Sequence, residues 1–200
     1  ISFSGNSATG WVAWPGASCG RAIFEVRANE SLTGALVEMR LPWLADFCTP
    51  YPQRLKGIAM LNVDDVADAV GEIQRAARLS LAGAMIPLRP MDKRYDHPNY
   101  EPLWVAAQDL AMPLSLHVGT YRLGAGMPVV SPTQDIVEFA NREGDVRRAL
   151  AALIFGGVFE RYPALKVGAV EFEIAWAPYF MDRMDNVYGE RAQGVAHHRF

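Results

Sequence analysis

The sequence predicts an α/β fold in which parallel strands alternate with helices. Apolar runs of strand length recur along the chain, at 55–62, 81–88, 113–119 and 166–173. Segments with a helical spacing of apolar residues separate these runs, and this order of strand and helix is typical of parallel βαβ units. The pattern fits either an open doubly wound sheet or part of a (β/α)8 barrel.

The strand that ends near His117 shows a two-residue alternation. Leu114 and Leu116 fall on one face, and Ser115 and His117 fall on the other. We expect the apolar face to pack under helices. The other face ends in an imidazole at the carboxyl end of the strand, where parallel α/β folds bind ligands.

The helices are expected between and after these strands. Val66, Val70 and Ile73 recur at helical steps, and Asp65 lies in the first turn, where the helix dipole favours a negative charge. Further helices are expected at 100–111, at 133–162 in two pieces separated near Gly144, and at 176–191.

The N-terminal part of the chain is the least regular. Residues 1–30 carry glycines and tryptophans at irregular positions, and we leave them unassigned, as a loop with at most one short strand. A helix is expected from Ser31, which is a suitable N-cap, until Pro42 kinks or ends it.

Composition and charge exclude several classes of protein. The chain has 200 residues, which suits a single domain, 1–200, with a sizeable core. Its net charge of −3 and the lack of a basic stripe argue against a nucleic-acid partner. Cys19 and Cys48 are too few for a disulfide framework or a zinc finger, and no strand opens into a nucleotide-binding glycine loop.

No apolar run is long enough to cross a membrane, and we find no signal peptide. We therefore expect a cytoplasmic protein with no membrane partner. The chain begins at Ile1 without a methionine and stops at Phe200 without a tail, so we expect a piece of a longer protein.

Two residues are the main candidates for chemistry. In the last strand the face of Ala169 continues to Glu171, so we expect His117 and Glu171 to meet at the carboxyl ends of neighbouring strands. Such a pair can provide a metal ligand and a general base, or handle a proton. The alternatives are a hydrogen-bonded core histidine at 117 and an ion pair between Glu171 and Arg183.

Three other histidines are weaker candidates. His97 lies in a turn before a helix. A histidine at such a position is usually exposed to solvent, although His97 can also lie at the carboxyl ends of the strands, where His117 and Glu171 are expected. His197 and His198 form a pair in an otherwise unpatterned tail, which is weak support for a metal site.

Four phrases of the chain resemble one family in their order and spacing. They are Pro52–Gly57, Asp96–Trp104, Pro113–His117 and Val158–Lys166. Together they resemble the amidohydrolase-2 group, the aminocarboxymuconate-semialdehyde decarboxylase-like branch of the amidohydrolase superfamily, over residues 40–192. The resemblance implies a (β/α)8 barrel, so it favours a partial TIM barrel over an open sheet.

The resemblance also implies one divalent metal, zinc or manganese. In the family a His-x-His or Glu-x-His pair on the first strand, a His on the fifth and an Asp on the eighth hold the ion. His117 matches the fifth-strand ligand, while the first-strand pair is not found and the Asp would lie beyond Phe200. Glu171 stands where many members carry a catalytic His. We therefore expect the middle of a barrel with most of its metal ligands missing.

The function expected of the full-length protein is metal-dependent hydrolysis or decarboxylation of a small carboxylated or cyclic compound. His117 would bind the metal, which polarises a carbonyl or activates water, and Glu171 would act as a base or orient the ligands. The alternative is a non-catalytic α/β binding or scaffold domain with His117 in its core. The chain alone should be inactive, bind metal poorly and, with open strand edges, be marginally stable or form a homo-oligomer.

Overall fold

The computed structural model of the chain describes residues 8–13, 23–26, 41–88, 90, 93–118, 120, 136–137 and 140–192. Within these residues a six-stranded sheet has the order β2-β1-β3-β4-β5-β6. Its strands are β1 Ala8–Ala13, β2 Ile23–Val26, β3 Lys56–Met60, β4 Gly83–Ile86, β5 Leu114–His117 and β6 Val167–Val170.

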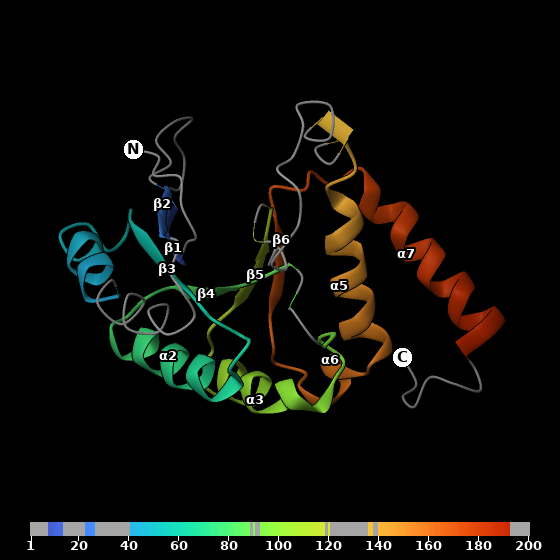
Figure 1. Ribbon diagram of the computed structural model, residues 1–200, viewed down its shortest axis with the longest axis horizontal. Helices are drawn as coiled ribbons and strands as arrows, with labels where there is room; N and C mark the ends of the chain where they lie inside the picture. The colour runs from blue at the N-terminus through green and yellow to red at the C-terminus, as the bar shows by residue number, and fades with distance from the viewer. Residues whose placement is uncertain are drawn as a thin grey trace.

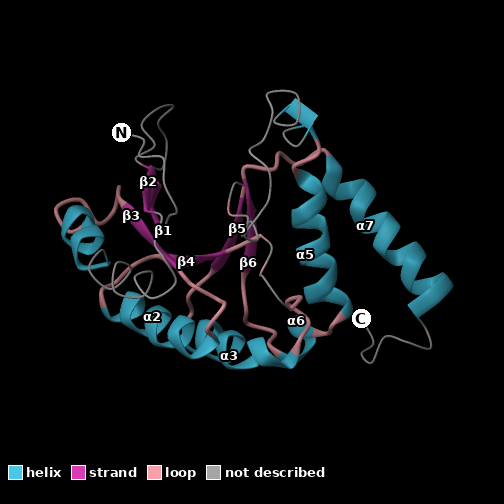
Figure 2. Cartoon of the chain, in the orientation of Figure 1, coloured by secondary structure: helices cyan, strands magenta, loops and turns pink. Residues whose placement is uncertain are grey.

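The parallel half of the sheet follows the sequence-based prediction. Strands β3, β4, β5 and β6 are adjacent in chain order, and each neighbouring pair is parallel. The sheet is curved, with helices along its outer side (Figures 1 and 2). This is the arrangement of part of a barrel, and it differs from an open sheet covered on both faces.

The helices described are α2 Val66–Arg78, η1 Pro98–Tyr100, α3 Glu101–Asp109, α5 Glu143–Phe155, α6 Val158–Arg161, α7 Trp176–Val187 and the π-helical turn η2 Tyr188–Ala192. Residues 41–48 are also helical. Helix α2 begins where expected, because the carboxylate of Asp65 accepts hydrogen bonds from the backbone N–H groups of Ala67 and Asp68. Among the described residues, no helix is both long and apolar enough to span a membrane.

The core lies between the outer face of the sheet and these helices. Leu114 and Leu116 of β5 are 2% and 0% exposed, and they pair in register with Ala84 and Ile86 of β4. All four belong to one buried cluster with apolar residues of α2 and α3, including Ile73. The face predicted to be apolar therefore packs under helices, since alternation sends every second side chain of β5 outward.

One expectation about local structure is wrong, and another lies mostly outside the described residues. Residues 8–13 and 23–26 form an antiparallel pair of strands, and β1 continues the sheet by pairing with β3, where a loop with at most one strand was expected. Pro42 lies inside the helical stretch 41–48, near its first turn, where a missing N–H costs nothing. The expected helix from Ser31 falls outside the described residues up to position 40.

The helical region after β5 divides at two places. A turn at 141–142 precedes α5, and Gly144 lies within the first turn of that helix. A second break, which the sequence pattern did not indicate, falls at Gly157, whose φ of 65° is left-handed and is easily adopted only without a Cβ.

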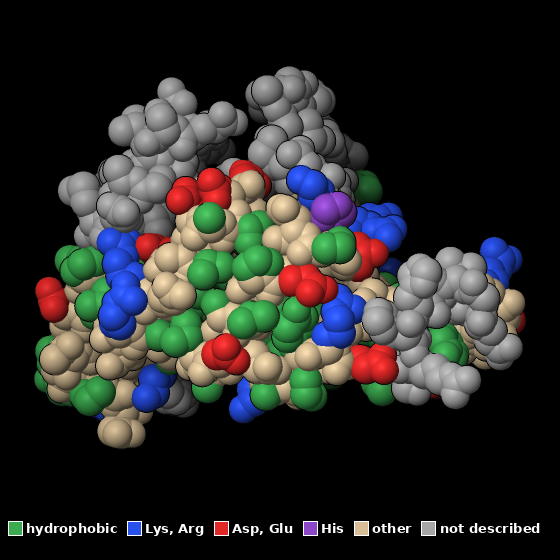
Figure 3. Space-filling view, turned by 90° about the horizontal axis from the view of Figure 1, so that it is seen from below, with side chains coloured by type: hydrophobic (Ala, Val, Ile, Leu, Met, Phe, Trp, Pro, Cys, Tyr) green, Lys and Arg blue, Asp and Glu red, His purple; other side chains and the backbone are tan. Residues whose placement is uncertain are grey.

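The outer face on the side of α2 and α3 shows acidic and basic side chains interspersed among apolar ones (Figure 3).

Candidate active site

His117 is the last residue of β5 and closes the inner face of that strand. Its side chain is nearly buried, since the residue is 5% exposed. The backbone around it is fixed by Thr120, whose hydroxyl donates to the carbonyl of His117 at 2.6 Å. The same hydroxyl accepts from the N–H of Leu88 at 3.0 Å, which ties the carboxyl end of β4 to that of β5.

The hydrogen bonding of His117 selects one form of its imidazole. Nδ1 lies 2.7 Å from the carbonyl oxygen of Val118. A carbonyl oxygen only accepts, so Nδ1 carries a proton and donates it. In the neutral ring Nε2 is then the unprotonated nitrogen, which is the one that can bind a metal ion or accept a proton.

Glu171 reaches His117 through a left-handed backbone, which the strand alternation did not indicate. Strand β6 ends at Val170, and Val170 pairs in register with His117. Continued alternation would therefore send Glu171 to the opposite, outer face. Its φ of 67° breaks the alternation and turns the side chain. The two residues are together as expected, but the strand-face argument for their meeting is wrong.

The carboxylate of Glu171 faces the imidazole edge. Oε2 lies 3.5 Å from Nε2 of His117, and the glutamate side chain is 21% exposed. This separation is longer than the direct N–H···O bond, which spans about 2.7–3.2 Å. A cation shared by the two atoms, either a proton or a metal ion, would stabilise this approach.

The bend that carries Glu171 is held by its neighbours. Glu173 is also left-handed, with φ 58°, and left-handed backbone costs about 1–2 kcal/mol for each non-glycine residue. Between the two, Phe172 is 3% exposed, and the burial of its side chain stabilises the fold by about 1.5–3 kcal/mol. The indole N–H of Trp176 donates to the Phe172 carbonyl at 2.7 Å and adds about 1 kcal/mol.

A third support for the bend is weaker. Arg142 forms an ion pair with Glu173 at 2.7 Å, but the glutamate side chain is 77% exposed. An exposed pair of this kind contributes less than about 1 kcal/mol. The sequence did not identify the residues that support the site, which are Trp176, Arg142 and Thr120. Residues that hold a bend or a loop in place carry no catalytic motif.

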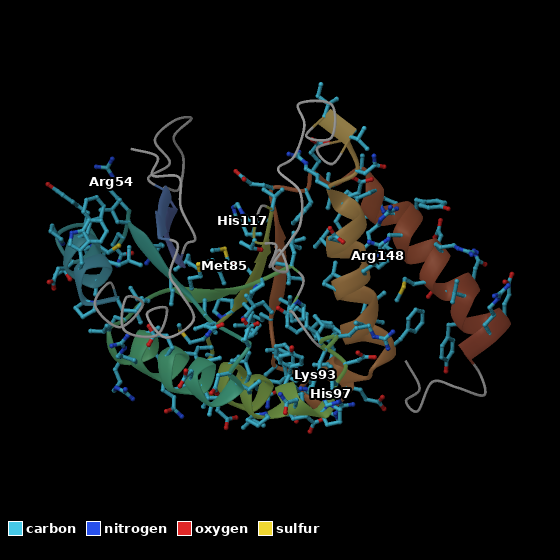
Figure 4. All side chains as sticks on the ribbon, in the orientation of Figure 1. Arg54, Met85, Lys93, His97, His117 and Arg148 are labelled. Carbon is cyan, nitrogen blue, oxygen red and sulfur yellow. The ribbon has the colours of Figure 1, made fainter. Side chains whose placement is uncertain are left out.

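The other candidate histidines lie elsewhere. His97 caps η1, since its Nδ1 accepts from the N–H of Asn99 at 3.1 Å. It is exposed and lies near Lys93, on the outer side and away from His117, which sits on the inner side near Met85 (Figure 4). His197 and His198 are outside the described residues. Arg183 is exposed on α7, and Glu171 forms an ion pair with His117.

A divalent metal fits the chemistry of the His117–Glu171 pair, but it needs more ligands. Imidazole nitrogen and carboxylate oxygen are donors that zinc and manganese both accept. Catalytic zinc takes about three protein ligands. In the part of the chain that the structure describes, no group of three His, Cys, Asp or Glu side chains is placed to hold an ion. The pair can therefore supply part of a metal site.

Comparison with known proteins finds decarboxylases among the relatives. Decarboxylase orsB of Emericella nidulans is 28% identical over 149 residues, which are 68% of this chain and 43% of that protein. Gamma-resorcylate decarboxylase of a Polaromonas species is 30% identical over 173 residues, 80% of this chain and 49% of the relative. The chain thus spans about half the length of the curated relatives it matches.

A solved decarboxylase structure is also similar to this chain, and a family model matches most of its length. A variant of 5-carboxyvanillate decarboxylase from Novosphingobium aromaticivorans, crystallised with manganese and 3-methoxy-4-hydroxy-5-nitrobenzoic acid, has a TM-score of 0.62 and 25% identity. The match covers 82% of this chain and 48% of that one. The fold is part of a (β/α)8 barrel. The amidohydrolase-2 model, described as Amidohydrolase, matches residues 21–198, and the chain therefore belongs to the amidohydrolase family.

Proposed function

We propose that the whole protein is a metal-dependent decarboxylase of a small aromatic carboxylic acid, and that His117 and Glu171 belong to its active site. The observation that carries the proposal is the 3.5 Å approach of Glu171 Oε2 to His117 Nε2 at the carboxyl ends of β5 and β6. The names of the curated relatives support decarboxylation over hydrolysis. Manganese in the related crystal structure supports the choice of metal, with zinc as the alternative.

His117 would hold the metal through Nε2. The hydrogen bond from Nδ1 to Val118 keeps the proton off Nε2 and fixes the plane of the ring. When bound, the metal supplies a positive charge that stabilises negative charge developing on the substrate's oxygen atoms. Further ligands would come from residues outside the described ones, because no group of three possible ligand side chains occurs among the described residues.

Glu171 would handle the proton. In the decarboxylation of an aromatic acid, the ring carbon that bears the carboxylate gains a proton, and its bond to CO2 breaks. The electron pair of that bond returns to the ring, so one proton is consumed for each CO2 released. Glu171, whose partly exposed carboxylate lies 3.5 Å from His117, is the acid beside the expected reacting centre and would deliver this proton.

The competing function is a non-catalytic binding or scaffold domain. Its support is the nearly buried His117, whose Nδ1 is satisfied by the backbone as in a structural histidine. A purely structural role does not explain why a left-handed bend turns a carboxylate toward Nε2. We propose a small molecule as the partner, as the names of the curated relatives indicate, and a cytoplasmic location.

The experiment compares variants of the whole gene product. Purified protein is loaded with manganese, analysed for metal content, and assayed for CO2 release from gamma-resorcylate and from 5-carboxyvanillate. His117→Ala should lose metal and activity together. Glu171→Gln should keep at least half of the metal and lose about 100- to 10,000-fold in kcat, the usual contribution of a general acid.

The matched control is His97→Asn, which replaces an exposed histidine and keeps an acceptor for the N–H of Asn99. It should retain full metal content and activity. Equal metal in the wild-type protein and in His117→Ala would remove His117 from the site. Absence of bound metal in the wild-type protein, together with no activity on either acid, would favour the scaffold function.

A further inference from the structure

The bend 171–173 contains two left-handed non-glycine residues directly after the strand that leads to the site. Strain of this kind persists only where the surroundings hold it, and it concentrates where a side chain must be aimed. The first of the two residues is Glu171, so the bend determines where its carboxylate lies. What holds the bend therefore also determines the separation of Glu171 from His117.

We propose that Trp176 is a positioning residue for Glu171, acting through the hydrogen bond from its indole N–H to the carbonyl of Phe172. This inference rests on the proposed catalytic role of Glu171. The carbonyl that receives the bond belongs to the residue directly after Glu171, at a donor–acceptor distance of 2.7 Å. A shift of that peptide unit moves the glutamate with it.

The indole is itself well anchored. Trp176 is the first residue of α7, it packs against the buried core cluster, and its ring contacts that of Phe180 edge-on at 5.8 Å. Its donor therefore sits on a helix, which is a rigid support compared with the bend. The side chain of Phe172 is buried in that cluster and also holds the bend. The Arg142–Glu173 ion pair is the lesser support, because the Glu173 side chain is largely exposed.

The test removes the donor and keeps the ring. Trp176→Phe in the whole, manganese-loaded gene product loses the N–H and retains an aromatic side chain next to Phe180. Because small misplacements of a catalytic group cost up to about 100-fold in rate, we expect kcat to fall by about 10- to 100-fold while KM stays within about twofold. Metal content should be unchanged, since His117 is untouched.

A double variant separates positioning from general damage. If Trp176 acts through Glu171, Trp176→Phe should lower kcat by less than about twofold in a Glu171→Gln background. Equal losses in both backgrounds would overturn the inference. The matched control is Trp104→Phe, the same substitution at a buried tryptophan on α3 whose indole nitrogen has no hydrogen-bond partner among the described residues. Its kcat should stay within about twofold of the wild-type value.

A measurement independent of activity completes the test. Amide hydrogen exchange of a peptide that covers 168–177 should become faster in Trp176→Phe, and a peptide from α3 should exchange as in the wild type. Unchanged exchange in the bend would overturn the inference even if kcat falls. Faster exchange in a protein that decarboxylates neither acid would confirm the support of the bend and count against the proposed function alone.

Discussion

Gly83 in β4 is a position where the methyl group added by substitution to alanine should push β4 away from β5. A Cβ built there would lie 2.7 Å from the carbonyl oxygen of Pro113 and 3.1 Å from Cγ of the same proline. That oxygen is a fixed part of the sheet, because it accepts the N–H of Ala84 at 2.9 Å. Gly83→Ala therefore forces β4 away from the start of β5, the strand that carries His117.

The size of the effect follows from the contact and from a matched substitution. Overpacking of this kind costs about 1–3 kcal/mol. Gly71 lies in the middle of α2 with nothing within 4 Å of a built Cβ. Gly71→Ala should therefore stabilise the chain by about 0.5–1 kcal/mol. The same chemical change is expected to have opposite signs at the two positions.

The measurement is thermal unfolding of the 200-residue chain followed by circular dichroism. With about 2–4 °C for each kcal/mol in a chain of this size, the two variants should differ in Tm by at least about 3 °C. Gly83→Ala should melt below the wild type and Gly71→Ala above it. If Gly83→Ala melts as high as Gly71→Ala, the close approach of β4 to Pro113 does not exist in solution.

Two further predictions concern stability. Asp65→Ala removes the side chain that accepts two backbone N–H groups at the start of α2, and it should cost about 0.5–2 kcal/mol in urea unfolding. Burial, and then the nearby Tyr100, raise the pKa of Tyr95 well above its ordinary value. The folded state thus retains the phenolic proton longer than the unfolded state, and stability that is present below about pH 10 should fall as the pH rises further. Tyr95→Phe should weaken this fall between about pH 10 and 12 and, by removing the hydrogen bond to Pro87, cost about 1 kcal/mol at pH 7. Equal alkaline slopes in both proteins would contradict the assignment to Tyr95, and some slope should remain because burial and Glu101 raise the pKa of Tyr162.

The parallel half of the sheet could be predicted because its pattern is local. Alternating apolar residues place Leu114 and Leu116 under the helices and His117 on the inner face, whatever the rest of the chain does. Helical spacing and Asp65 likewise place α2 from a short stretch of sequence. The antiparallel pair of β1 and β2 was missed, since β1 joins the sheet by pairing with β3, more than forty residues further along.

The meeting of His117 and Glu171 shows the limit of sequence patterns. The residue types and the order of strands indicated which two side chains belong together. Alternation alone would place Glu171 on the wrong face, because it takes the strand to run past Val170. Only the tertiary structure supplies the left-handed bend, through the burial of Phe172 and the hydrogen bond from Trp176. The physical reason is that packing stabilises a backbone conformation that local preference disfavours.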